Sequence, residues 1–149
     1  MKKNLAVVIL ACMALSQAFA VQASTKHFRS THEHFTEYAA MASDLFLSTE
    51  DSAQRNTLGL LAAAANFQAE RAFLIMQMTD VLDHMTAKKD RTFVETRIQE
   101  LKEFILGTIR AEIKRIGDLA MNQEDKDIKA LGNLIVNELR VFERNTENL

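Results

Sequence analysis

Residues 94–119, VETRIQELKEFILGTIRAEIKRIGDL, carry the pattern that decides the fold. The apolar residues of this stretch return every three or four positions, at Val94, Ile98, Leu101, Ile105, Ile109, Ile116 and Leu119. This spacing puts them on one face of an α-helix, and such a face is buried against the rest of a fold. The stretch therefore predicts a core-facing helix, which we place from about Thr92 to Ala120.

Three other segments show the same periodicity. We expect one helix before the polar run 48–56, a second from about Thr57 to Thr86, and a last one ending near Thr146. Their apolar stripes are Phe28, Phe35, Ala39, Ala42 and Phe46; Leu60, Ala64, Phe67, Leu74, Met78, Val81 and Met85; and Ile128, Leu131, Ile135, Leu139 and Phe142. The chain has no proline, and no segment alternates with the period of two that strands require.

Candidate helix starts come from capping residues. Ser30-Thr31-His32-Glu33 and Thr92-Phe93-Val94-Glu95 have the form of capping boxes. The first box begins a helix or lies in one that has already begun near Thr25. Asn122 is the expected N-cap of the last helix, because Glu124 and Asp125 then suit its N-terminal dipole.

Short loops between long helices force sequential neighbours to run antiparallel. The predicted fold is thus all-α, an up-down-up-down antiparallel four-helix bundle, with residues 24–149 as a single domain.

The first 23 residues predict a secretory signal peptide. Lys2 and Lys3 precede an uncharged apolar stretch from Leu5 to Leu15, which is too short to span a bilayer of about 30 Å. Small residues follow at Ala18-Phe19-Ala20 and at Val21-Gln22-Ala23, so we expect cleavage after Ala20 or Ala23 and a periplasmic or secreted product. The alternative is a lipoprotein anchored through Cys12, but the apolar run continues beyond that cysteine.

Export changes the chemistry that the chain can offer. The full chain has 18 basic and 20 acidic residues, so loss of Lys2 and Lys3 leaves 16 against 20 and a net charge of −4. This balance argues against nucleic-acid binding, which needs clustered basic residues. The only cysteine, Cys12, leaves with the signal, so the exported domain is expected to have no disulfide, thiolate nucleophile or cysteine-bound metal.

Sequence motifs for catalysis or cofactor binding are lacking. His27, His32 and His34 cluster in sequence, but His32 and His34 face opposite sides of a helix, and His27 lies about 10 Å along the axis from His34. We found no Glu-x-x-His motif, no pair of facing haem ligands and no glycine-rich phosphate loop. We therefore expect no metal, no cofactor and no enzymatic activity.

Three charged residues fall on predicted core faces. Arg71 lies between Phe67 and Leu74, and Glu112 and Glu138 lie on the apolar stripes of the last two helices. Antiparallel folding brings them to a similar height, together with Glu33, His34 and Glu37 of the first helix. We expect a polar layer with Arg71 paired to Glu138, Glu112 or both, which either fixes helix register or forms a ligand pocket.

The second helix is unusually apolar. Between Leu58 and Thr79 only Glu70 and Arg71 are charged, and Phe73 falls within its narrow polar strip. This helix is either the most buried of the bundle or a binding surface that includes Phe73 and Met76.

These features favour a non-catalytic periplasmic protein that binds a protein partner, as an adaptor, inhibitor or chaperone-like factor. Homo-oligomers are compatible with this reading. A second hypothesis is a ligand-binding or sensing bundle built on the layer around Arg71. A third is an envelope protein that lies on lipid, with Lys88, Lys89 and Arg91 at one end.

Overall fold

The chain folds into four α-helices joined by three short loops. A computed structural model describes the backbone of residues 2–149 and the side chains of residues 25–149. The helices are α1 (Lys2–Ser48), α2 (Ser52–His84), α3 (Lys88–Met121) and α4 (Lys126–Glu147). Residues 2–149 contain no β-strand, so the predicted all-α class is confirmed. The predicted signal peptide, residues 1–23 with Cys12, lies outside the part whose side chains are described.

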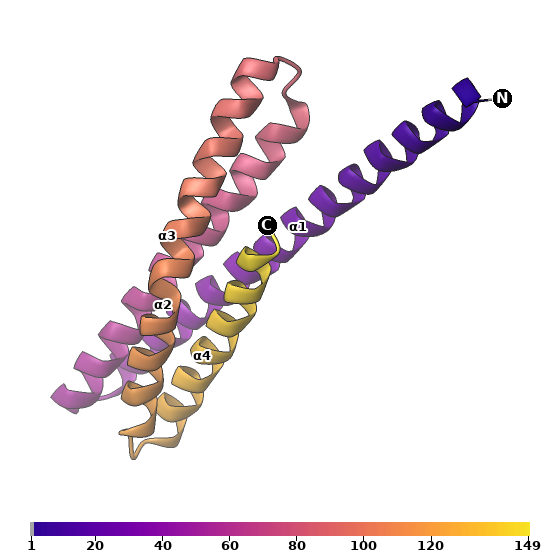
Figure 1. Cartoon of the computed structure of the whole chain (residues 1–149). Helices are drawn as coiled ribbons and strands as arrows, with labels where there is room; N and C mark the ends of the chain where they lie inside the picture. The colour runs from indigo at the N-terminus through magenta and orange to yellow at the C-terminus, as the bar shows by residue number, and fades with distance from the viewer. Residues whose placement is uncertain (1) are drawn as a thin grey trace.

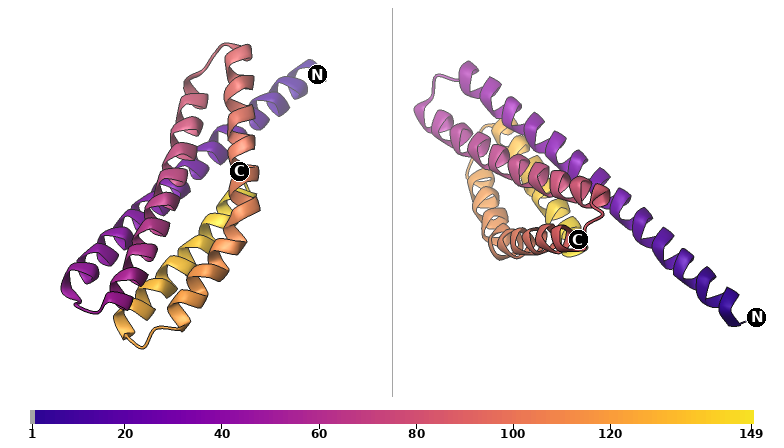
Figure 2. Two further views of the ribbon diagram at one scale, coloured as in Figure 1. Left: turned by 90° about the vertical axis from the view of Figure 1, so that its left-hand side faces the viewer. Right: turned by 90° about the horizontal axis from the view of Figure 1, so that it is seen from above.

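The helices form an antiparallel four-helix bundle, as predicted. Figures 1 and 2 show α2 running back along α1, α3 back along α2, and α4 back along α3. α1 packs against α2 and α4, and α3 packs against the same two helices. α1 and α3 therefore occupy opposite corners of the bundle.

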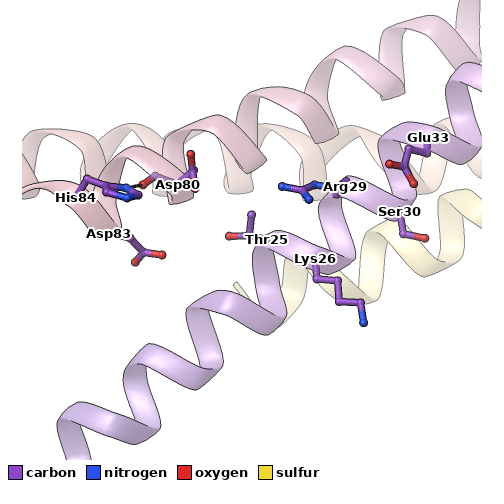
Figure 3. Close-up of a pocket in the computed structure, with 8 residues that line it drawn as sticks. All are labelled: Thr25, Lys26, Arg29, Ser30, Glu33, Asp80, Asp83 and His84. Carbon is purple, nitrogen blue, oxygen red and sulfur yellow. Dashed lines mark hydrogen bonds between the residues drawn. The ribbon is translucent and has the colours of Figure 1, made fainter.

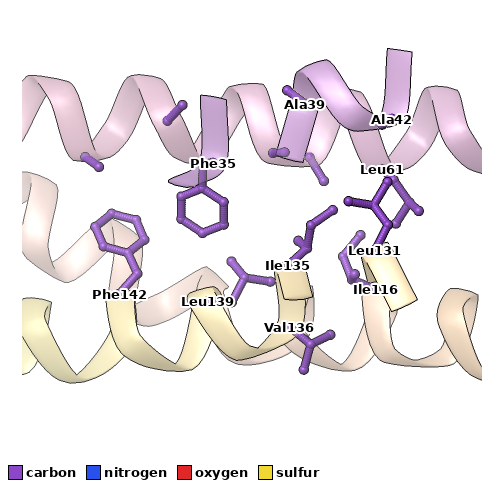
Figure 4. Close-up of a cluster of buried hydrophobic side chains, with 14 of the residues drawn as sticks. Phe35, Ala39, Ala42, Leu61, Ile116, Leu131, Ile135, Val136, Leu139 and Phe142 are labelled. Carbon is purple, nitrogen blue, oxygen red and sulfur yellow. The ribbon is translucent and has the colours of Figure 1, made fainter. Parts of the chain in front are cut away.

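The core lies where α1, α2 and α4 meet the second half of α3. Figure 4 shows apolar side chains from all four helices converging there, including Phe35, Leu61, Ile116 and Ile135. The ring of Phe142 on α4 packs edge-on against Phe28 and Phe35 of α1, with ring centroids 6.0 and 6.1 Å apart. The stripe predicted for the last helix is buried throughout.

The core face of α2 differs from the prediction. Leu60, Phe67, Leu74 and Val81, placed in the core by their periodicity, are between 38% and 48% exposed. Ala64 of the predicted stripe is buried, and the rest of the buried apolar face consists of Leu58, Leu61 and Ile75 with three further alanines, Ala65, Ala69 and Ala72. Alanines on this face let α1 approach closely, and the phenylalanines of α1 and α4 fill the space between the helices.

The helix boundaries also correct the expected caps. Asp51 caps α2 by accepting a hydrogen bond from the Gln54 backbone N–H at 2.8 Å, so α2 begins before Thr57. Asp125 caps α4, whereas Asn122 ends α3. Both expected capping boxes lie inside helices, because the chain is already helical before Ser30 and before Thr92.

Candidate functional site

Two of the three charged residues predicted for the polar layer are buried. Arg71 is 6% exposed and Glu138 is 7% exposed, while Glu112 is partly exposed. Arg71 lies at the seam between α2 and α3, whereas Glu138 faces α1 from α4. The expected ion pairs between Arg71 and the two glutamates are not formed, because each residue has other neighbours.

Arg71 is held by neutral groups and aromatic rings. Its Nη1 donates to Oε1 of Gln68 and to Oγ1 of Thr108, both at 3.3 Å. The guanidinium lies over the rings of Phe67 and Phe104, at 4.0 and 4.6 Å from their centroids. Such cation–π contacts offset part of the loss of hydration.

Arg71 has no ion-pair partner within 4.0 Å in the described part of the chain, and its Nε is buried without a hydrogen bond. Burial lowers the pKa of Arg71, and the more distant charge of Glu112 offsets part of this effect. Glu112 itself is bound by Arg115 one turn later, at 2.7 and 2.9 Å. The arginine is thus a buried cation that lacks a matching carboxylate.

Glu138 is paired with the first helix. Its Oε2 lies 3.0 Å from Nδ1 of His34, whose side chain is partly exposed. The ring of Tyr38 stacks on His34 at 6.3 Å between centroids, and burial, followed by the charges of Glu138 and Glu37, raises the pKa of Tyr38. This cluster confirms the expectation that His34 and Glu138 lie at a similar height, and it links α1 to α4.

The surface predicted around Phe73 and Met76 is only partly open. Phe73 is exposed and packs beside the ring of His32, 5.1 Å between centroids, while Met76 packs partly buried against the core. Nδ1 of His32 lies 3.0 Å from the carbonyl oxygen of Ala69. Phe73 is therefore one exposed aromatic residue between α1 and α2.

A larger apolar surface lies on the outer side of α2 and α3. We call it the α2–α3 face and define it by six exposed side chains: Leu60, Phe67, Leu74, Val81, Phe93 and Phe104. Phe67 and Phe104 both contact the Arg71 guanidinium, so α2 and α3 meet at this point of the face. The sequence alone did not find this face, because the periodicity of α2 fits a buried stripe equally well.

An open polar hollow of about 730 Å³ lies between α1 and the end of α2 (Figure 3). Lys26 and Arg29 line it on α1, and Asp80, Asp83 and His84 line it on α2. Figure 3 shows these side chains spread around the hollow rather than converging on one point. Its mixed charges give no distinct preference for a cation or an anion.

The remaining candidates do not assemble into a site. In residues 25–149 no three His, Cys, Asp or Glu side chains are grouped so as to hold a metal ion. Arg91, considered above as a lipid contact, donates to the carbonyl oxygens of Leu82 and Met85 and so binds the C-terminus of α2. Among the described residues, no helix has the length and hydropathy of a membrane span.

Comparison with protein-family models, curated proteins and solved structures finds no match to this chain.

Proposed function

We propose that the protein is a non-catalytic, exported helical-bundle protein that acts by binding a protein partner through the α2–α3 face. The observation that carries this proposal is the exposure of apolar side chains along two neighbouring helices. Phe93 is 62% exposed and Phe104 is 54% exposed, beside the α2 residues already described. Large exposed apolar side chains gathered on neighbouring helices are typical of protein-protein contact sites.

The composition of the surface supports a protein ligand. Phenylalanine is enriched in the buried centres of protein interfaces, and arginine is the charged residue most often found there. The α2–α3 face contains three phenylalanines, and two of them, Phe67 and Phe104, flank the guanidinium of Arg71. The lack of recognisable catalytic motifs in the sequence favours a binding role over catalysis.

The proposal is tested by crosslinking the tagged, exported protein in cell-envelope extracts and identifying what is captured. Phe93→Asp places a charge on the proposed surface, and Leu47→Asp is the matched control because Leu47 is 78% exposed at the end of α1. We expect one protein to be captured by wild type and by the control but not by Phe93→Asp. Equal capture by all three, or no specific capture, would contradict the proposal.

Export is tested separately. N-terminal sequencing of the protein from the periplasmic fraction should begin at Val21 or Ser24. A lipid-modified Cys12 at the N-terminus would instead show a membrane-anchored protein.

A second candidate function is the binding of an anionic group by Arg71. It is favoured by the missing carboxylate beside this buried cation. Arg71→Met removes the charge but retains much of the side-chain volume. If the variant is as stable as wild type and retains every measured binding activity, Arg71 is not a ligand site.

A further inference from the structure

Arg71 is a buried cation with one donor atom that still reaches the surface of the α2–α3 face. Nη1 makes both hydrogen bonds of the guanidinium, to Gln68 and Thr108, and Nε is buried without a partner. Nη2 has no hydrogen bond within the described part of the chain, and it is not itself buried. The edge of the guanidinium that carries Nη2 is therefore open to an incoming acceptor.

Large apolar side chains surround this open edge. Phe67 precedes Arg71 by four residues and Leu74 follows it by three, so both lie beside it on the same side of α2. Phe104 of α3 contacts the guanidinium from the neighbouring helix. All three apolar side chains are exposed. A group that binds Nη2 must therefore lie among apolar side chains, which exclude water from the contact.

Residues 25–149 do not supply a carboxylate at this point. Glu70 is the neighbouring residue, but it is exposed, and consecutive side chains point about 100° apart around a helix. Glu112 of α3 is bound by Arg115 at 2.7 and 2.9 Å. Among these residues, no carboxylate oxygen lies within 4.0 Å of the Arg71 guanidinium. Because a buried charge is costly unless it is paired, the open edge of Arg71 is suited to an anion from another molecule.

The charge and surroundings of the site favour a carboxylate over a phosphate group. Nη2 offers two N–H groups of a singly charged guanidinium, which match a single negative charge. A phosphate group carries close to two negative charges and three acceptor oxygens, so it needs further donors. The apolar side chains around Arg71 fit a carboxylate on an apolar scaffold, such as a glutamate or aspartate side chain with apolar neighbours.

We propose that the protein partner places an acidic side chain, flanked by apolar residues, among Phe67, Leu74 and Phe104, where its carboxylate accepts hydrogen bonds from Nη2 of Arg71. This inference rests on the proposed function, because it names the chemistry that the partner presents to the α2–α3 face. It also gives a source for the anionic group considered above for Arg71. Arg71 is then the charged centre of the interface.

Titration of the exported protein with 4-phenylbutanoate, followed by its backbone amide shifts in NMR spectra, tests the carboxylate site without the partner. The neutral 4-phenylbutanamide is the matched probe, because it has the same ring and chain but no charge. Wild type should bind the carboxylate at least about tenfold more tightly than the amide, and it should bind inorganic phosphate more weakly than the carboxylate. The shifted signals should belong to α2 near residue 71 and to α3 near residue 104.

Arg71→Met should abolish the preference for the carboxylate, so that the two probes bind within about threefold of each other. Arg110→Met is the matched control, because Arg110 is exposed on α3 and pairs with Glu143 and Glu147 of α4. The control should retain the full preference of wild type. Circular dichroism establishes that both variants are folded.

The comparison of probes on wild type needs no variant, so it decides the question even if Arg71→Met does not fold. Equal affinity for the carboxylate and the amide, tighter binding of phosphate, or shifts confined to other parts of the molecule would overturn the inference. A preference that a folded Arg71→Met protein retains would overturn it as well.

The proposed function and this inference fail separately. In the crosslinking experiment, Arg71→Met should capture the partner at least about tenfold less than wild type, and 4-phenylbutanoate should compete with the partner. Full capture by Arg71→Met, together with loss of capture by Phe93→Asp, would retain the proposed function and overturn the inference. A carboxylate preference that depends on Arg71, without capture of any protein, would contradict the proposed function, while the carboxylate site itself would remain.

Discussion

At the scale of single residues, Gly132 marks a close approach between α3 and α4. A Cβ atom built on Gly132 would lie 2.5 Å from the Cβ of Ala120 and 3.3 Å from its Cα. Ala120 and Gly132 are both buried, so α3 and α4 meet here without room for a further methyl group. Gly107 offers the contrast, because a Cβ there would meet nothing within 4 Å.

Replacing these two glycines by alanine should change stability in opposite directions. Gly132→Ala forces α3 and α4 apart and should destabilise the fold by about 1–3 kcal/mol. Gly107→Ala adds a better helix former at an open position and should stabilise it by about 0.5–1 kcal/mol. Urea unfolding followed by circular dichroism measures both changes. A Gly132→Ala protein as stable as Gly107→Ala would contradict the close packing.

Ionisation of Tyr38 makes the stability of the folded protein depend on pH in the alkaline range. Its pKa in the folded state lies above the usual 10.0, because burial and then the charges of Glu138 and Glu37 disfavour the tyrosinate. The unfolded chain then loses this proton at lower pH than the folded one, so the stabilisation is complete below about pH 10 and declines as pH rises through the folded-state pKa. Tyr38→Phe should lose less stability than wild type between pH 9 and 11.

Absorbance at 295 nm gives a direct measurement, because Tyr38 is the only tyrosine and the chain has no tryptophan. Native protein should ionise at higher pH than protein in urea. Coincident titration curves would show that Tyr38 is not perturbed by the fold.

At the scale of the helices, the two aspartate caps explain where α2 and α4 begin. Oδ1 of Asp125 accepts hydrogen bonds from the backbone N–H groups of Asp127 and Ile128, at 2.9 and 3.1 Å. These N–H groups have no partner within the helix, so the side chain replaces water there. Thr92, predicted to begin a helix, instead donates to the carbonyl oxygen of Lys88 inside α3.

Removing the side chain of Asp125, which caps α4, should therefore lower the stability of the fold more than removing that of Thr92, which caps no helix. Asp125→Ala should lower the free energy of unfolding by about 1 kcal/mol. Thr92→Ala, at an exposed position within α3, should change it by less than about 0.5 kcal/mol. Chemical denaturation of the two variants compares them directly. A larger loss for Thr92→Ala would mean that α3 begins at the predicted box.

The helices could be predicted from periodicity, but the side that α2 turns to the core could not. In α4 one face is apolar and the other polar, so the pattern has a single solution. In α2 apolar residues surround the axis, and Phe67 and Ala69 are equally compatible with burial. In the structure the alanine face of α2 is buried, because alanine side chains allow α1 to pack closely against it. The burial of Arg71 and Glu138, in contrast, could be predicted, because each is a charged residue at a position that the periodicity assigns to the core.

The residues that pair with these charges could not be predicted from the sequence. Pairing depends on how far each helix is rotated about its axis, and a rotation of one residue is about 100°. Glu138 turned toward His34, while Glu112 was already bound by Arg115 on its own helix. Among residues 25–149, no carboxylate oxygen lies within 4.0 Å of the Arg71 guanidinium.

At the scale of the whole molecule, α4 covers only part of α3. The amino group of Lys102 donates to the carbonyl oxygen of Glu147, so the end of α4 lies level with the middle of α3. All fully buried residues of α3, from Ile105 to Ala120, follow this point. The first half of α3 therefore packs against α2 without a further layer (Figure 2).

Hydrogen exchange should divide the molecule at this level. Backbone amides of residues 92–101 should exchange faster than those of residues 131–142, because few buried apolar contacts oppose local opening there. Exchange measured by mass spectrometry resolves these two segments. Equal protection in a dilute sample would show that something else stabilises the first half of α3.

The loop that joins α2 to α3 is consequently a suitable place to lengthen the chain. Residues 85–87 lie at the tip of a helical hairpin, away from the core formed with α4 (Figure 1). Exposed tips of this kind accept inserted sequences, since their ends are already held together by the helices on either side. A fluorescent or affinity domain placed between Thr86 and Ala87 would report on the molecule in its own compartment while both termini remain native.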